Sequence, residues 1–382
     1  MTEVVRPVAA RIFEVTGALG TDASNASMAW RERRGLLLEL CDREGRIGQG
    51  EASPLPGFSS DTLAEARAGL LGVDWAGLPV LSPGHGLLND IEAALSAAGL
   101  NAPAARFAAE TALLDLAGQA AGLPVHVLLA GTRPGAGADG TRPSAVPLAA
   151  LLARDLPARD LLASAADRVG EGYGCLKVKV GRAPAEELAV LGALRAELGD
   201  AVLLRADANG SLDAEVAPGW LQGAADLGLE FVEEPLPLAR LRELLPSPVS
   251  VAIDESLDAG DDSGLAPALE AGGYRYVVLK PGYHGGALRC LRLAAEARSL
   301  GALPVVSHLL GGPVALAAAA ELALALPPGP AAGLAPHAGL YMWPALELPA
   351  YGRAEILPHD RPGLGLPPLA SLGGPGAWRE VG

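Results

Sequence analysis

Short apolar runs that carry a charged residue at or near their end recur through the middle of the chain. They are 175–180, 202–207, 229–234, 249–254 and 274–280, and each has the length and composition of a buried strand. Their charged ends follow one another at intervals of roughly 20 to 30 residues, which fits one strand plus one helix per unit. This rhythm predicts a barrel whose chemistry lies at the C-terminal ends of its strands.

Other segments extend this barrel on both sides. The pattern predicts a first strand at 145–151, a helix at 158–170, a seventh strand at 303–308 and a short eighth strand at 332–335. The apolar run 314–326 follows Pro313 and is interrupted by Glu321. Because it is shorter than the roughly 20 residues that a membrane span needs, it predicts a packed helix.

The first third of the chain has three predicted strands ahead of its helices. The strands are 4–15, 35–42 and 46–51, and the helices begin near residue 61 and cover 87–98 and 103–120. This order is typical of an α+β domain. Segment 17–34 is polar and aperiodic, and two interpretations stay open for it, a mobile flap over a site or a plain surface loop.

The Gly/Pro-rich segment 131–143 is the best candidate for a boundary or an inserted loop. We predict an α+β capping domain at 1–125, the barrel at 126–339 and a tail at 340–382 that packs back on the capping domain. The 382 residues accommodate a barrel of roughly 250 residues plus a smaller domain.

Acidic residues outnumber basic ones, 44 against 29, which gives a formal net charge of −15. This balance argues against a nucleic-acid partner or an anionic membrane surface, since both require basic patches. A small anionic carboxylate substrate remains compatible, because a divalent cation and lysines make a site locally positive. Three scattered cysteines without a CxxC motif and the lack of a signal-like start predict a cytoplasmic protein with reduced thiols. The oligomeric state is left open.

Lysines occupy two opposite sides of the predicted barrel. Lys177 and Lys179 are two residues apart in one strand, so their side chains share a face. If that face lines the barrel, burial and mutual repulsion both lower a lysine pKa toward the range of a general base. The alternative is an edge strand whose lysines extend into solvent. Lys280 ends the sixth strand and is followed by Pro281, which stops strand pairing. It lies across the predicted barrel from the strand of Lys179, so a substrate could lie between the two lysines.

Three carboxylates, those of Asp207, Glu233 and Asp254, each end a separate predicted strand. They would repel one another at a single point unless a hard cation lay between them, and oxygen ligands suit Mg²⁺, with Mn²⁺ as a second candidate. Singly, each could instead be a solvated loop acid or a helix N-cap. Glu234 and Glu255 are adjacent alternatives. Because neighbouring side chains of a strand face opposite ways, only one residue of each pair can reach the metal without a local twist. A cation on a substrate carboxylate, with a lysine beside it, makes an α-proton removable by stabilising the enediolate.

Five motifs in fixed order resemble the enolase superfamily, in its muconate-lactonizing-enzyme-like branch. They are LKVKVG at 176–181, RADAN at 205–209, VEEP at 232–235, IDES at 253–256 and LKP at 279–281. The resemblance covers nearly the whole chain and implies an α/β fold, a modified TIM barrel of the (β/α)7β type with an α+β capping domain. It also implies Mg²⁺ at Asp207, Glu233 and Asp254, with Lys179 as the base and Lys280 on the opposite face.

Two N-terminal motifs, RGLLLEL at 34–40 and GEASPLPGFS at 50–59, resemble the o-succinylbenzoate synthase family of menaquinone biosynthesis, as does Arg205. This implies a hydro-lyase that dehydrates 2-succinyl-6-hydroxy-2,4-cyclohexadiene-1-carboxylate to 2-succinylbenzoate. Lys179 would remove the α-proton and return it to the departing hydroxyl, while Lys280 supports the enediolate. Lys177 and Arg205 complete the set of catalytic candidates.

The segment Ser-His-Leu-Leu-Gly-Gly at 307–312 departs from the serine-rich run expected in that family. The backbone N–H groups of Gly311 and Gly312 are candidates for holding a substrate carboxylate. Ser307 and His308 are further candidate contacts, with a packed strand-end histidine as the alternative for His308. The other histidines show no ligand-like spacing and are assigned to the surface or to loops; they are His85, His126, His284, His337 and His359.

Two alternative functions stay open. Racemisation or epimerisation of N-acyl amino acids uses the same two lysines, and N-succinyl amino acids have a tail like that of the synthase substrate. Resemblance to dipeptide epimerases would imply an acidic DxD pair near the eighth strand to hold a free amine. Segment 331–337 has no carboxylate, which disfavours dipeptides. The second alternative is a catalytically inactive binding protein on the same fold. It is disfavoured because nothing structural requires five unscreened charges in one barrel mouth.

Overall fold

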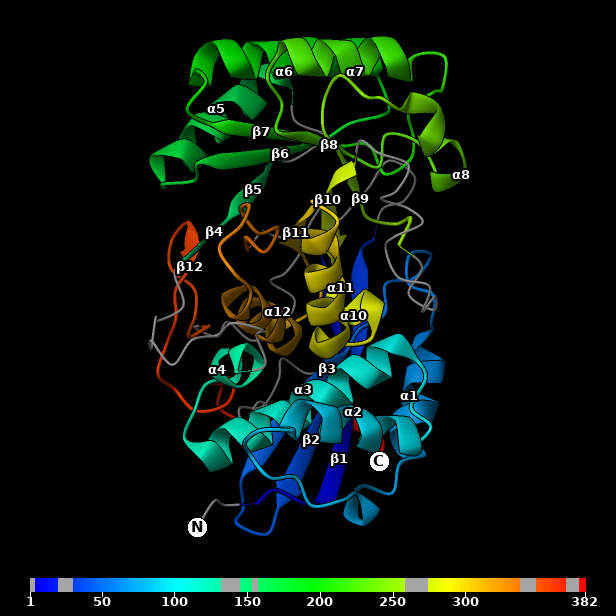
Figure 1. Ribbon diagram of the computed structural model, residues 1–382, viewed down its shortest axis with the longest axis vertical. Helices are drawn as coiled ribbons and strands as arrows, with labels where there is room; N and C mark the ends of the chain where they lie inside the picture. Colours follow the sequence, from blue (N-terminus) through cyan, green and yellow to red (C-terminus); the bar gives the residue numbers. More distant parts are fainter. Residues whose placement is uncertain are drawn as a thin grey trace.

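The structure is a computed structural model of the 382-residue chain, and it describes residues 4–19, 30–131, 145–152, 157–257, 274–336, 348–368 and 378–382. Parts of segments 17–34, 131–143 and 340–382, together with His337, lie outside these ranges. Figure 1 shows an antiparallel sheet and its helices at the bottom, with a parallel sheet and its helices above. The predicted domain boundaries stay a prediction.

The larger sheet contains seven parallel strands whose spatial order follows the chain. They are β5 (Ala149–Leu152), β6 (Cys175–Lys179), β7 (Leu203–Asp207), β8 (Phe231–Glu233), β9 (Val251–Ile253), β10 (Tyr274–Leu279) and β11 (Leu303–Val306). The bridges Leu148–Ala332 and Ser307–Gly333 connect its two edges. The predicted modified barrel is thereby confirmed, although single bridges stand where a short eighth strand was expected.

The predicted first barrel strand is divided in two. Its first part, β4 (Val146–Pro147), pairs with β12 (Glu355–Ile356), and only its second part, β5, joins the barrel. The C-terminal segment therefore pairs with the strand that leads into the barrel as well as with the N-terminal sheet.

Helices follow the barrel strands as the strand-plus-helix spacing predicts. They are α5 (Ala158–Gly170), α6 (Pro184–Leu198), α7 (Ala217–Asp226), α8 (Leu238–Leu241) with the 3₁₀ turn Arg242–Leu244, α10 (Pro281–His284), α11 (Ala287–Ser299) and α12 (Pro313–Ala325). Helix α12 is packed inside, as its apolar run predicts, and it buries Glu321 as well. None of the helices in the described residues combines the length and apolar character that a bilayer crossing requires.

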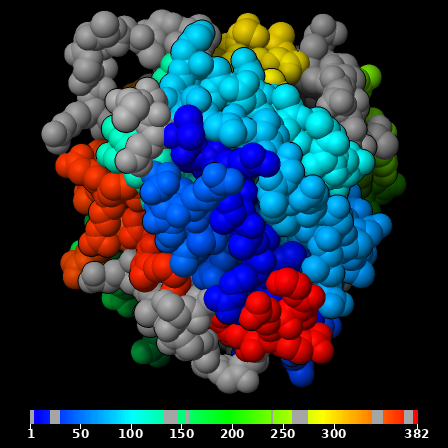
Figure 2. Space-filling model, turned by 90° about the horizontal axis from the view of Figure 1, so that it is seen from below, coloured from blue at the N-terminus to red at the C-terminus, as the bar shows by residue number. Residues whose placement is uncertain are grey.

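Within the described ranges, the N-terminal part combines four antiparallel strands with four helices. The strands lie in the order β13 (Arg379–Glu380), β1 (Pro7–Ala18), β2 (Glu32–Asp42) and β3 (Ile47–Ala52). The helices are α1 (Leu63–Leu71), α2 (Leu87–Ala97), α3 (Pro103–Ala121) and α4 (Val125–Ala130), and a 3₁₀ turn covers Trp75–Gly77. Seen from below, the C-terminal residues lie against the N-terminal strands (Figure 2).

Helix α3 packs closely on β3 because two strand positions lack a side chain. A Cβ atom on Gly50 would lie 1.8 Å from the backbone oxygen of Ala108, and one on Gly48 would lie 2.2 Å from that of Ala112. Glycine therefore allows the helix and strand backbones to approach one another here. The same strand carries Glu51, whose carboxylate binds the start of the barrel helix α12.

Two buried acids on α3 bind backbone N–H groups of distant segments. Glu110 accepts from the N–H of Leu288, in the first turn of α11. Asp115 accepts from Gln49 of β3 and from Leu364 near the C-terminus. Burial raises the pKa of Glu110 to about 7 and that of Asp115 to about 6, against the opposing effect of these hydrogen bonds. Both acids couple the N-terminal part to the rest of the molecule.

We expect Glu110→Gln to weaken the dependence of stability on pH. In the folded chain Glu110 keeps its proton up to a pKa of about 7, whereas its ordinary value is 4.5. Between these values the folded state binds more protons than the unfolded state, so the free energy of unfolding falls as the pH rises. The stabilisation by the protonated Glu110 is lost once the pH passes its folded pKa. Without this group, the fall between about pH 5 and about pH 7.5 should be smaller by about 1–2 kcal/mol.

Urea unfolding of both proteins at the two pH values measures this difference. Glu215→Gln, at an exposed position, is the matched control and should behave like the unmodified chain. An equal pH dependence in all three proteins would contradict the role assigned to Glu110.

Candidate active site

A cavity of about 910 Å³, its open mouth included, lies at the C-terminal ends of the barrel strands. Its charged lining residues are Lys177, Lys179, Arg205, Asp207, Glu233 and Lys280. Asp254 is buried directly beside them and forms an ion pair with Lys280. The tertiary structure therefore brings all the predicted lysines and carboxylates to one place, because parallel strands of a barrel end on the same face.

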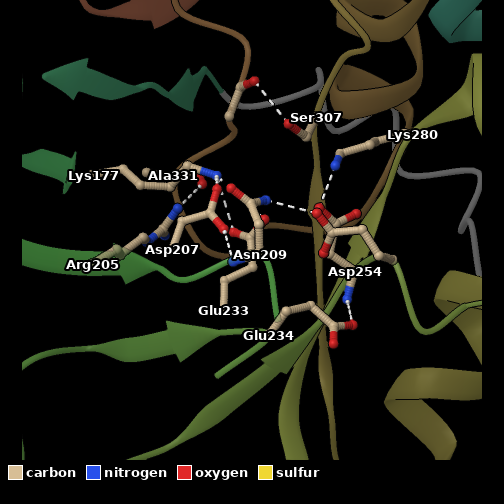
Figure 3. Close-up of polar contacts among 12 residues, drawn as sticks. Lys177, Arg205, Asp207, Asn209, Glu233, Glu234, Asp254, Lys280, Ser307 and Ala331 are labelled. Carbon is tan, nitrogen blue, oxygen red and sulfur yellow. Dashed lines mark hydrogen bonds and ion pairs between the residues drawn. The ribbon is translucent and has the colours of Figure 1, made fainter. Parts of the chain in front are cut away.

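Lys177 lies between two of the carboxylates. Its Nζ is 2.9 Å from Asp207 Oδ2 and 3.1 Å from Glu233 Oε2 (Figure 3). Burial by itself would lower the pKa of Lys177, but the charges of Asp207 and Glu233 outweigh it and raise that pKa above its usual value. The expected lowering of a lysine pKa therefore does not occur at Lys177, which stays an ammonium cation.

Lys179 has the opposite electrostatic balance. Burial lowers its pKa, and the charges of Lys177 and Lys280 add to that effect, while Asp207 opposes it. Of the three lysines in this cavity, Lys179 alone has a pKa below its usual value. A lowered pKa favours the neutral amine, which is the form that can accept a proton.

Lys280 approaches the carboxylates from the side opposite Lys177 (Figure 3). Its amine forms an ion pair with Asp254 and lies 4.5 Å from the centre of the Phe58 ring. Burial would lower the pKa of Lys280, but Asp254 and Glu255 raise it above the usual value. Lys280 is therefore a cation held between a carboxylate and an aromatic face.

The three strand-end carboxylates lie on adjacent strands and fit a divalent cation. Asp207 is in register with Glu233, and Glu233 shares a hydrogen bond with Asp254. Burial raises the pKa of Asp254 well above its usual value, whereas the two neighbouring lysines hold that of Asp207 below its own despite burial. Two carboxylates so close must share a proton or a cation, and a set made only of oxygens suits a hard ion.

The two acids next to these carboxylates, Glu234 and Glu255, have different positions. Glu234 turns away and accepts from the backbone N–H groups of Asp254 and Ser256, at 2.7 and 2.8 Å. Glu255 instead lies near the cluster and accepts from Asn209 Nδ2 at 2.6 Å. Asn209 also lines the cavity, and the sequence analysis assigned no role to it, although it ends the RADAN motif.

Arg205 lies deeper in the barrel. Its guanidinium is 1% exposed, bonds to Glu230 Oε2 and to the Ala331 carbonyl at 2.7 Å each, and stacks on Phe231 with 4.6 Å between guanidinium carbon and ring centre. Its Nη2 has no hydrogen-bond partner. Arg205 therefore binds the segment that closes the barrel and lines the cavity from below.

The wall after β11 differs from the prediction for Gly312. Ser307 and His308 do line the cavity, and His308 Nδ1 accepts from the N–H of Leu310 at 3.0 Å. The N–H of Gly312, predicted to bind a substrate carboxylate, instead donates to Glu51 Oε1 at 2.5 Å. Gly311 lies against the Glu51 carboxylate and Ala315 and does not line the main cavity. The start of α12 is thus already occupied by a protein carboxylate.

Two buried residues of the N-terminal sheet hold this wall, and sequence reasoning missed both. Glu51 also accepts from the N–H of Ala315 at 3.1 Å and from the hydroxyl of Ser53 at 2.6 Å. Arg33 donates to the carbonyls of Leu309 and Leu310, and to those of Ser53 and Pro54. Glu51 falls within the GEASPLPGFS motif, which was the signal available for it.

The histidine assignments are partly wrong. His85 is exposed as predicted, but His284 and His126 are buried, at 2% and 1% exposure. His126 bonds to Glu321, and so does His359, which lies in a loop. Among the described residues these three form a group of possible metal ligands whose donor atoms lie within 4.8 Å of one another, a criterion that the strand-end carboxylates do not meet. Lys177 lies between two of those carboxylates, Asp207 and Glu233.

The chain matches two protein-family models. The model described as Enolase C-terminal domain-like matches residues 160–370, and the model described as MenC, N-terminal domain matches residues 24–75. The first match covers more than half of the chain. The protein therefore belongs to the enolase superfamily, whose members are enzymes, and its relatives catalyse lyase or isomerase reactions.

Relatives with known names narrow the family further, but they catalyse different reactions. An o-succinylbenzoate synthase of Thermosynechococcus vestitus is 34% identical over 65% of this chain and 67% of its own length. An L-Lys-D/L-Arg epimerase of Methylococcus capsulatus is 28% identical over 76% and 79%. The chain lies in the muconate-lactonizing-enzyme-like branch and resembles o-succinylbenzoate synthases, as its motifs predicted.

Solved structures agree on the fold. Muconate lactonizing enzyme from Pseudomonas fluorescens, complexed with muconolactone, has a TM-score of 0.78 at 23% identity, over 95% of this chain and 96% of that one. A dipeptide epimerase from Enterococcus faecalis, complexed with Mg and L-Leu-L-Tyr, has a TM-score of 0.76 at 23% identity, over 94% and 99%. At this identity the likeness shows the fold alone.

We expect Glu51→Gln to destabilise the protein by about 1–3 kcal/mol, because the amide group leaves a buried N–H of α12 without an acceptor. Arg33 also loses the charge that stabilises it. Urea unfolding measures the loss. The exposed ion pair of Glu243 with Arg240 supplies a control, since Glu243→Gln should change the free energy of unfolding by less than about 1 kcal/mol. A Glu51→Gln variant as stable as this control would contradict the assignment.

Proposed function

We propose that the protein dehydrates 2-succinyl-6-hydroxy-2,4-cyclohexadiene-1-carboxylate to 2-succinylbenzoate, the product for which the o-succinylbenzoate synthases are named. The observation that carries the proposal is the division among the lysines. Lys179 has a lowered pKa suited to a base, whereas Lys177 and Lys280 stay cationic beside it. The similarity to the synthase of Thermosynechococcus vestitus and the match of residues 24–75 to the MenC N-terminal model support this choice.

We assign Asp207, Glu233 and Asp254 as ligands of Mg²⁺. When bound, this cation would supply electrophilic stabilisation of the negative charge that develops on the substrate carboxylate. Lys177 holds Asp207 and Glu233 through its ion pairs, so it orients two of these ligands. Lys280 is cationic and provides a positive charge on the opposite side of the cluster.

Lys179 acts as the base and then as the acid. Its neutral amine takes the α-proton, the electrons of that C–H bond form the new ring double bond, and the C–O bond to the hydroxyl breaks. The resulting ammonium returns the proton to the departing hydroxyl, which leaves as water. One lysine therefore serves both steps, because the reaction removes a proton and a hydroxide overall.

The cavity has an apolar side that suits the substrate ring. Trp30 and Leu55 form a small apolar cluster with Phe58 and Leu310, and all four line the cavity. This wall comes from the N-terminal part and from the segment after β11. The polar Ser307 and His308 line the same cavity and are candidate partners of the succinyl carboxylate. Substrate choice thus falls to residues outside the lysine and carboxylate cluster.

Racemisation of N-succinyl amino acids is the second candidate. Lys280 lies across the carboxylates from Lys177 of β6, the strand that also carries Lys179 (Figure 3). Proton transfer to two faces of one carbon requires Lys179 and Lys280 on opposite sides of the substrate. The similarity to an L-Lys-D/L-Arg epimerase also supports it. In that reaction Lys280 would deliver a proton, whereas in the dehydration it only stabilises charge.

We expect Lys179→Ala to abolish dehydration, with a loss of at least about 10³-fold in kcat, because the base is removed. Millimolar Mg²⁺ should still raise the thermal midpoint of this variant, since its carboxylates are intact. Loss of the diene absorbance measures turnover. Substantial turnover by Lys179→Ala would refute the base assignment. The absence of any Mg²⁺ stabilisation in the unmodified chain would instead favour an inactive binding protein.

A parallel assay on the two substrate classes tests the reaction itself. With Mg²⁺, we expect loss of the cyclohexadiene absorbance and no racemisation of N-succinyl amino acids. Lys280→Met should slow the dehydration but leave exchange of the α-proton with solvent deuterium detectable by NMR, because Lys179 still removes that proton. Fast racemisation, abolished equally by Lys179→Ala and Lys280→Met, would establish the second candidate in place of the first.

A further inference from the structure

A second cluster of metal-ligating side chains lies away from the barrel mouth. It joins His126 of α4, Glu321 of α12 and His359 of the C-terminal segment. His126 Nδ1 is 2.9 Å from Glu321 Oε2, and His359 Nε2 is 2.7 Å from Glu321 Oε1. The three donor atoms lie within 4.8 Å of one another. None of these residues takes part in the chemistry proposed above.

The charge of Glu321 is unusual for its position. Glu321 is the one charged residue in the apolar helix α12 and is 1% exposed. Its salt-bridge partners among the described residues are the two imidazoles, which carry no net charge when neutral. A buried carboxylate requires a compensating positive charge, and a divalent cation between the three side chains would supply it.

The donor set also selects the kind of cation. Two imidazole nitrogens and one carboxylate are typical ligands of Zn²⁺ and similar transition ions, which accept a fourth ligand such as water. Mg²⁺ prefers oxygen ligands alone, so the two clusters differ in the ions that they favour. The His359 side chain is 9% exposed, which leaves a short path from the surface to this cluster.

We propose that His126, Glu321 and His359 bind a transition-metal dication of the Zn²⁺ type, separate from the cation of the active site. The ion would connect helix α4, helix α12 and the C-terminal segment. The site does not depend on the proposed reaction, because none of its residues lines the active-site cavity.

Binding changes the hydrogen bonds of both imidazoles. A carboxylate only accepts, so His126 Nδ1 and His359 Nε2 now carry hydrogens, and each must move to the other ring nitrogen before a metal binds. His359 Nδ1 at present accepts from the N–H of Arg361 at 3.2 Å. Metal binding therefore opens this contact, and the exposed Arg361 then bonds to water. This cost predicts moderate affinity.

The test uses the full chain, stripped of metal with a chelator and then saturated with Mg²⁺. Zn²⁺ binding is measured by equilibrium dialysis, and Co²⁺ binding by its visible absorption. We expect one additional ion per chain and the intense absorption of a four-coordinate Co²⁺ with nitrogen ligands. His359→Gln should weaken Zn²⁺ binding at least about tenfold, since a glutamine amide is a poor zinc ligand but keeps an N–H for Glu321.

Three further variants separate the two sites. Glu321→Gln should weaken Zn²⁺ binding like His359→Gln, and the exposed His85→Gln should leave it unchanged. Asp207→Asn, which weakens the active-site cluster, should retain the additional Zn²⁺. Unchanged Zn²⁺ affinity in both His359→Gln and Glu321→Gln would overturn the proposal. Loss of the Zn²⁺ in Asp207→Asn, or the weak absorption of octahedral Co²⁺, would do the same.

Discussion

The bond between the Glu51 carboxylate and the first turn of α12 is the contact on which the arrangement of the active site depends. Glu51 is fully buried and comes from β3 of the N-terminal sheet, yet it satisfies N–H groups of the last barrel helix. Arg33 on the adjacent strand binds the carbonyls just ahead of that helix. A buried charge requires hydrogen-bond donors, and the first turn of a helix requires acceptors for its free N–H groups. Here Glu51 and the start of α12 satisfy one another.

Buried carboxylates also accept hydrogen bonds from distant backbone N–H groups at other contacts of the N-terminal part. Glu110 accepts from the first turn of α11, and Asp115 accepts from Leu364 near the C-terminus. Each contact places a carboxylate where a helix or loop has an unpaired N–H, so the two parts of the chain can join in one orientation. Since the cavity is walled by both parts, this orientation decides which substrate shape it accepts.

Inside the barrel mouth, small differences in position assign different protonation states to one residue type. Lys177 touches two carboxylates and stays charged, whereas Lys179, two residues later on the same strand, has a lowered pKa because burial and two positive neighbours dominate. The strand period places both on one face. The register aligns Lys179 with Asp207, yet it is the amine of Lys177 that lies against Asp207 and Glu233. The sequence thus shows which residues can carry a charge, whereas tertiary contacts determine which of them are protonated.

The sequence by itself determined the repeated strands, the parallel barrel and the residues that end its strands, because these follow from local apolar patterns and ordered motifs. Only the tertiary structure decided that Gly312 faces Glu51 and that His126 is buried beside Glu321, since these contacts join residues 261 and 195 positions apart. No local pattern encodes such pairs. Long-range packing selects the partner of each buried polar group, and it does so only once the two parts of the chain have met.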